Sequence, residues 1–129
     1  MKELTDKYSD YKAVSYDVDV VIGEYDDPSS IIQGLVSVNL AQDNCIVIGV
    51  PGSGKENLLT TLVYSACIYH TPNEVQFYIL DFGSESLNIL KDMPHVGNVI
   101  TIDSKDKVKK TFQYLEKQIK KRKALFADY

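Results

Sequence analysis

The chain has 129 residues, of which 44% are hydrophobic and 25% are charged, with 14 basic against 18 acidic side chains. This length is typical of a single domain, and the composition excludes disordered, collagen-like and low-complexity proteins. No apolar run reaches the roughly 18 residues that a membrane span needs, so we expect no direct membrane span. The start of the chain lacks the apolar stretch of a signal peptide. Because the only cysteines are Cys45 and Cys67, a disulfide framework is excluded and a reducing compartment is expected.

The charge is distributed unevenly along the chain. Residues 1–100 carry a net charge of −9, whereas residues 101–129 carry +5. The basic run at 120–123 could indicate contact with nucleic acid or a membrane surface. Apolar residues interrupt the charges at helical spacing, however, so we predict a solvated helix face and regard nucleic acid as an unfavoured partner.

The first part of the chain predicts two paired strands. Apolar and polar residues alternate over 14–22 and again over 36–40, which is typical of half-buried strands. The intervening segment 23–30 contains two aspartates and a proline and predicts a turn. We therefore expect residues 1–40 to form a lead-in with a strand pair, and residues 41–129 to form a separate core.

The core is predicted to contain three buried strands. Apolar runs occupy residues 45–48, 75–80 and 96–102, and the first run is apolar on both faces, as in the central strand of a parallel sheet. The second run ends at Asp81. Three such strands make a small sheet with poorly covered edges, so we expect the chain to be part of a longer unit.

Helical spacing predicts what connects these strands. Residues 55–69 carry apolar side chains on one helical face, and Pro72 prevents the helix from continuing. A short helix is expected at 86–91. After Ser104, which can cap a helix, a second amphipathic pattern runs to the end of the chain. The alternation of strands and helices predicts an α/β fold with parallel strands.

A glycine-rich segment between the first core strand and its helix fits the phosphate-binding loop pattern G-x-x-x-x-G-K. Glycines allow consecutive backbone N–H groups to point at an anion, and the helix start and the lysine add positive charge. The alternative is a tight strand–helix turn without a ligand. The residues expected to hold a nucleotide are Gly49, Pro51, Gly52, Ser53, Gly54, Lys55, Glu56 and Asn57.

The loop departs from the usual pattern at one position. The residue after Lys55 is normally serine or threonine, whose hydroxyl binds Mg²⁺, but here it is Glu56. A carboxylate beside bound phosphates adds repulsion, although it could reach the metal or a metal-bound water. We predict that ATP binding is weakened rather than abolished.

Asp81 is the candidate for the second element of a nucleotide site. It follows an apolar strand, and in that place it would hold a water bound to Mg²⁺; it is also the one possible catalytic residue. The alternative is an aspartate that only caps a turn. The next residue is Phe82, so the glutamate that many such ATPases place there to activate water is absent. Glu85 is a poor substitute, and the pattern favours binding over hydrolysis.

Taken together, these segments resemble a P-loop ATPase module of the FtsK/SpoIIIE superfamily, and more narrowly the last (third) ATPase domain of the EssC/YukB-type proteins of type VII secretion. The resemblance covers most of the chain, and the stretches at 77–83 and 90–97 together are its most discriminating part. The segments that carry it are YDDP at 25–28, GVPGSGK at 49–55, FYILDFG at 77–83, LKDMPHVG at 90–97 and RKALF at 122–126.

The resemblance implies a RecA-like three-layer sandwich, here truncated, within the cytoplasmic part of a bacterial cell-membrane protein. It implies ATP and Mg²⁺ as ligands, and other ATPase modules of the same parent and secreted WXG-type proteins as partners. In this family, later modules often have degenerate sites, which Glu56 and Phe82 match. The family's module is longer than this chain, so independent hydrolysis is not expected.

Three functions therefore remain open. The first is a nucleotide-binding module of a secretion motor, with weak or no hydrolysis of its own. The second is a pseudo-ATPase that docks secreted WXG-type substrates through a vestigial loop. The third is a DNA-translocating relative, suggested by the basic carboxy-terminal segment.

Overall fold

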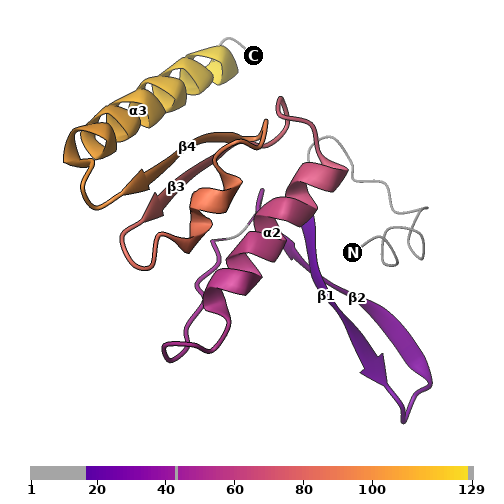
Figure 1. The fold of residues 1–129 in the computed structure, drawn as a ribbon. Coiled ribbons are helices and arrows are strands. Elements are labelled where there is room, and N and C mark those ends of the chain that lie inside the picture. Colours follow the sequence, from indigo (N-terminus) through magenta and orange to yellow (C-terminus); the bar gives the residue numbers. More distant parts are fainter. Residues whose placement is uncertain (1–16, 43, 128–129) are drawn as a thin grey trace. The chain divides into compact units, whose positions relative to one another are not determined.

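The computed structural model describes residues 17–42 and 44–127. The chain divides into two compact units, Met1–Gln76 and Phe77–Tyr129, and each is considered on its own (Figure 1). Parallel strands in one unit and an antiparallel strand pair in the other confirm the mixed α/β class. The predicted division separates a lead-in, residues 1–40, from a core, residues 41–129, and it stays a prediction.

The first unit contains the expected antiparallel pair, β1 (Asp19–Asp27) and β2 (Ile32–Asn39). The predicted turn lay too early, because β1 continues through most of it and the chain reverses only after Asp27. There the Asp27 carboxylate accepts hydrogen bonds from the Ser29 backbone N–H at 3.1 Å and from its hydroxyl at 2.7 Å. An aspartate bonded to the backbone two residues on is a turn-forming contact, so the turn begins at Asp27.

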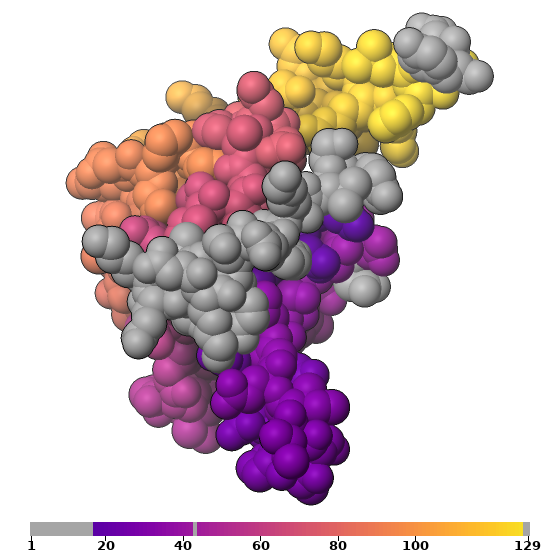
Figure 2. Space-filling view, turned by 90° about the vertical axis from the view of Figure 1, so that its right-hand side faces the viewer, coloured from indigo at the N-terminus to yellow at the C-terminus, as the bar shows by residue number. Residues whose placement is uncertain are grey.

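Within the strand pair, the ring of Tyr25 lies close to the neighbouring strand. Tyr25 pairs with Gly34, and a Cβ atom at position 34 would lie 2.6 Å from the Tyr25 ring. Glycine therefore allows the ring to lie directly on the neighbouring strand. Much of the surface of this pair is open to solvent, as Figure 2 shows from indigo to purple, and Ile31 in the turn is 93% exposed. The predicted strand positions 14–16 lie outside the described residues.

The prediction of a central strand at 45–48 is wrong. The structure assigns no strand to residues 44–50, and Ile46 and Ile48 are 83% and 91% exposed. A parallel strand exists only where a neighbour completes its hydrogen-bond ladder, and no described strand pairs with this segment. The apolar run shows that the segment has side chains suited to burial, but it does not show which strand would pair with it.

The predicted helix at 55–69 is confirmed as α2 (Lys55–Tyr69). Its buried side chains include Leu62, Val63 and Ala66, and the helix packs against β1, where Val20 is fully buried. The helix ends before Thr71 and Pro72, as expected. This packing holds the second half of α2, and the start of the helix and the glycine-rich loop before it belong to the same unit.

The second unit begins with β3 (Phe77–Asp81) and η1 (Ser86–Leu90), followed by β4 (Val96–Thr101), which pairs with β3 in parallel. The parallel arrangement and the short helix are confirmed. The core of this unit is small and centres on Ile100, which has no exposed surface, with the apolar side chains Leu87, Leu90 and Val96 also buried.

The unit closes with α3 (Lys105–Ala127), which lies along one face of the β3–β4 pair (Figure 1). Ser104 stands before its first turn, and its carbonyl accepts hydrogen bonds from Lys107 and Val108 at 2.9 and 3.3 Å. The predicted apolar stripe is present, but no residue of α3 is buried among those described, and Phe112 and Ile119 are more than half exposed.

Candidate functional site

The glycine-rich loop takes a conformation that only glycines adopt readily. Gly52 and Gly54 have φ angles of 77° and 87°, in the left-handed region that a Cβ atom disfavours. Gly54 is the N-cap residue of α2, and its carbonyl accepts a hydrogen bond from the Leu58 N–H at 2.9 Å. The two glycines therefore turn the chain directly into the start of the helix.

The loop also closes tightly on itself. A Cβ atom at Gly49 would lie 2.5 Å from the Ser53 hydroxyl oxygen, so a larger residue would push this side chain out of place. The Lys55 ammonium donates hydrogen bonds to the carbonyls of Gly49 and Val50, at 2.5 and 2.7 Å. The ammonium group thus lies across the loop, supported by carbonyl oxygens that a phosphate oxygen could replace.

The loop surrounds an open hollow of about 360 Å³ beside the first turn of α2. Six of the eight predicted nucleotide-binding residues line it. Of the other two, Gly49 accepts a hydrogen bond from the Lys55 ammonium, and Ser53 lies close to Gly49. The residues that line it are Pro51, Gly52, Gly54, Lys55, Glu56 and Asn57. A helix start and an ammonium group favour an anion here, and no atom lies within 4 Å of where a Cβ atom of Gly52 or Gly54 would stand, so the backbone at both glycines is open to a ligand.

Glu56 is the residue that does not fit a magnesium nucleotide. It lies in the first turn of α2, where a negative side chain stabilises the helix. The same side chain lines the hollow, so the charge that favours the helix repels a phosphate. The nearest hydroxyl on the helix, that of Thr60, donates to the Glu56 backbone carbonyl at 2.9 Å. The loop therefore offers an ammonium group and a helix start to an anion but lacks the usual serine or threonine ligand to Mg²⁺.

Asp81 lies in the second unit, at the end of β3, and is 7% exposed. Its Oδ1 accepts a hydrogen bond from the Gly83 N–H at 3.2 Å, and its Oδ2 accepts one from the Leu87 N–H at 3.1 Å. Both carboxylate oxygens thus hold the turn between β3 and η1. These bonds match the alternative of a turn-capping aspartate, and its role beside Mg²⁺ stays a prediction.

In the part of the chain that the structure describes, no group of three or more histidine, cysteine, aspartate or glutamate side chains could hold a metal ion. Cys67 and His70, which have the spacing of half a zinc site, lie at the end of α2, where His70 is buried and its Nε2 lies 3.3 Å from the Asp19 carbonyl oxygen.

Sequence reasoning missed a second hollow, formed between β3, β4 and α3. Tyr78 and Tyr114 fall on the apolar stripes of their strand and helix, which favours core positions, but both line this hollow, and Tyr114 is 43% exposed. The pattern that could have revealed it is the set of lysines at the start of α3. Cations are unfavourable at the positive end of a helix, so a cluster there needs another explanation.

A glycine-rich loop that follows the pattern G-x-x-x-x-G-K, runs into a helix and lines an open hollow, in an α/β protein, is typical of the P-loop class of nucleotide-binding modules. Within that class, the family model described as "FtsK/SpoIIIE family" matches residues 10–129. The chain belongs to the FtsK/SpoIIIE family.

The relatives and solved structures that it resembles are type VII secretion proteins. It is 40% identical over 94 residues to the ESX-1 secretion system protein EccCb1 of Mycolicibacterium smegmatis. This match covers 73% of this chain and 16% of that protein. It is 30% identical over 114 residues to the type VII secretion system protein EssC of Staphylococcus aureus. That match covers 88% of this chain and 8% of EssC. The chain therefore spans less than a fifth of the length of these relatives.

Among the solved structures that the chain resembles is Thermomonospora curvata EccC (ATPases 2 and 3) in complex with a signal sequence peptide. The TM-score is 0.81 at 31% identity, and the match covers 92% of this chain and 22% of that one. The match confirms that the fold is that of an ATPase domain of this group. Among residues 17–42 and 44–127, no helix is both long and apolar enough to cross a bilayer.

Proposed function

We propose that this chain is the nucleotide-binding module of a type VII secretion ATPase, which binds ATP at residues 49–57 and hydrolyses it weakly or not at all. The observation that carries the proposal is the position of the Lys55 ammonium, held over a loop with two left-handed glycines at the start of α2. ATP binding requires Lys55 to exchange the carbonyls of Gly49 and Val50 for phosphate oxygens. A charged acceptor makes a stronger bond than a neutral one, which favours that exchange.

Weak hydrolysis follows from two side chains. Glu56 replaces the hydroxyl that would bind Mg²⁺, and Phe82, 49% exposed, follows Asp81 where an acidic residue would activate water. When bound, Mg²⁺ supplies charge neutralisation between the phosphates. Glu56 could reach the metal or a metal-bound water, and Asp81 would hold a water bound to the metal. Neither assignment provides a general base.

Replacing Glu56 with threonine is expected to tighten Mg-ATP binding by about tenfold, because the change removes a repulsive charge and supplies the missing hydroxyl. Isothermal titration of the 129-residue chain with Mg-ATP measures the effect. Glu56→Gln is the matched control, since it removes the charge without adding the hydroxyl ligand. If neither variant binds more tightly than the parent chain, our account of Glu56 is wrong.

The proposed setting is the cytoplasmic part of a bacterial membrane protein that contains further ATPase modules. The chain matches a small part of EccCb1 and EssC, and the solved EccC fragment contains two such modules and a signal sequence peptide. By this likeness, we include adjacent modules and secreted WXG-type proteins among the partners of the parent protein.

A pseudo-ATPase that docks secreted substrates is the second candidate, and Glu56 is the observation that favours it. Titrating the chain with a secretion signal peptide, with and without Mg-ATP, separates the two functions. A docking module binds the peptide with equal affinity in both conditions. A nucleotide-operated module binds it with different affinities.

The DNA-translocating alternative is not favoured, because the whole chain has a net charge of −4. It requires DNA binding that weakens steeply as salt rises.

A further inference from the structure

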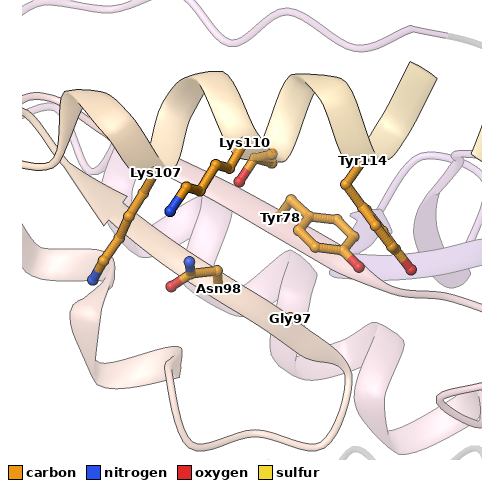
Figure 3. Close-up of a pocket in the computed structure, with 7 residues that line it drawn as sticks. Tyr78, Gly97, Asn98, Lys107, Lys110 and Tyr114 are labelled. Carbon is orange, nitrogen blue, oxygen red and sulfur yellow. The ribbon is translucent and has the colours of Figure 1, made fainter. Parts of the chain in front are cut away.

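The hollow between β3, β4 and α3 is a pocket of about 350 Å³ that is broadly open to solvent and lies within the second unit (Figure 3). A volume of this size lies at the small end of the range for ligand pockets, so it can hold a few side chains. Three elements contribute to it. The residues that line it are Tyr78, Gly97, Asn98, Lys107, Lys110, Thr111 and Tyr114.

Two tyrosines form the apolar end of the pocket. The ring of Tyr78 lies directly on β4, where a Cβ atom at Gly97 would be 2.7 Å from it. The ring of Tyr114 on α3 stands 5.6 Å from that of Tyr78, centre to centre, at 47°. A hydrogen bond between the Tyr78 and Tyr114 hydroxyls raises the pKa of Tyr78, so the polar ends of the two side chains lie together. The rings thus offer an apolar wall with a polar edge.

Two lysines form the other end. Figure 3 shows Lys107 and Lys110 extending from α3 on the side of Asn98, away from the tyrosine pair. Among the described residues, the ion pair on α3 is that of Lys120 with Glu116, at 2.8 Å, and neither pocket lysine is paired with a carboxylate. The pocket therefore presents two ammonium groups next to an apolar wall.

The position of these lysines is unfavourable for the helix itself. Four lysines lie among the first six residues of α3, with Asp106 as the acidic residue there, although cations destabilise the positive end of a helix. The whole of α3 carries nine basic and two acidic side chains. Helix stability does not explain the cluster, whereas binding of a negatively charged group does.

We propose that this pocket binds an acidic peptide segment, with its carboxylates at Lys107 and Lys110 and an adjacent apolar or aromatic side chain against Tyr78 and Tyr114. The side-chain amide of Asn98 can form a hydrogen bond with the peptide backbone between the carboxylates and the apolar side chain. Nucleic acid fits less well, because a phosphate backbone has no apolar side chain for the tyrosine end. The site belongs to the second unit and does not depend on nucleotide bound at residues 49–57.

The test uses a fluorescent peptide with two adjacent glutamates followed by a tyrosine, titrated with the 129-residue chain and followed by anisotropy. The Lys107→Gln/Lys110→Gln variant is expected to weaken binding by about tenfold, since two charged contacts are lost. The matched control, Lys109→Gln/Lys117→Gln, removes the same charge from α3 outside the pocket and should change affinity by less than about twofold.

Shape and charge can be separated in the same assay. Gly97→Ala, whose Cβ would displace the Tyr78 ring, should also weaken binding while the lysines are intact, and circular dichroism verifies its fold. A peptide with glutamines in place of the glutamates should bind poorly. Equal losses in the pocket and control variants, or no binding at all, would overturn the proposal. Displacement of the peptide by single-stranded DNA of equal charge would also overturn it, in favour of nucleic acid.

Discussion

Replacing Lys55 with alanine is expected to weaken ATP binding by at least about tenfold, which corresponds to about 1.4 kcal/mol. Among the described residues that line the hollow beside α2, Lys55 is the one that carries a positive charge. Without it, the bound phosphates would meet Glu56 with only backbone N–H groups and the helix start to offset the repulsion. Titration calorimetry with ATP, in the presence and absence of Mg²⁺, measures the loss.

The control for this variant is Lys117→Ala, which removes an exposed lysine of α3 that does not line either hollow. It should leave the ATP affinity unchanged. Because Lys55 also bonds to the carbonyls of Gly49 and Val50, thermal unfolding of Lys55→Ala is measured alongside binding. Unchanged affinity in a variant that keeps its fold would contradict a phosphate role for Lys55 and leave the loop as a plain turn.

Local sequence patterns predicted most elements of the fold correctly. α2, η1 and the parallel β3 and β4 lie within a few residues of their expected places. Their signals are local, because helical spacing, a proline and an apolar run act within a few residues of themselves. The turn between β1 and β2 was misplaced because both Gly23 and Pro28 favour turns. The Asp27 contacts, which decide between them, are visible only in three dimensions.

The strand expected at 45–48 failed for a different reason. Its apolar residues are suited to a central strand, but a strand depends on hydrogen bonds with another segment, which a local pattern cannot represent. The apolar stripe of α3 has the same limitation, because its spacing does not specify a partner surface. Phe112 and Ile119 fall on the predicted face, and nothing in the spacing says which surface covers them.

In the candidate site, the residues of the loop could be predicted from the sequence. For Asp81, the position could be predicted but the hydrogen bonds could not. Glycines at 52 and 54 and the lysine at 55 are recognisable from spacing, because the geometry demands those residue types. The sequence also places Asp81 at the end of a strand. It cannot show that both carboxylate oxygens are bonded to the backbone N–H groups of Gly83 and Leu87, since these bonds depend on the path of the following turn.

Those two bonds lead to the second large effect. Asp81→Asn is expected to lower the free energy of unfolding by about 1–3 kcal/mol, because the asparagine NH₂ group cannot accept and one backbone N–H loses its partner. Asp81 and the Leu87 bond are both buried, so water does not readily replace what is lost. Urea denaturation measures the change, with Asp92→Asn, at an exposed position, as the control.

The same variant distinguishes the two roles of Asp81. If the carboxylate also acts on Mg²⁺, then Asp81→Asn should reduce the gain in ATP affinity that Mg²⁺ provides, and this loss should persist at temperatures where the variant is fully folded. If the Mg²⁺ dependence is unchanged while stability falls, Asp81 only holds the turn between β3 and η1. Full stability in the variant would instead show that the bonds to Gly83 and Leu87 contribute little, and that the turn is held by the packing of Leu87 and Leu90.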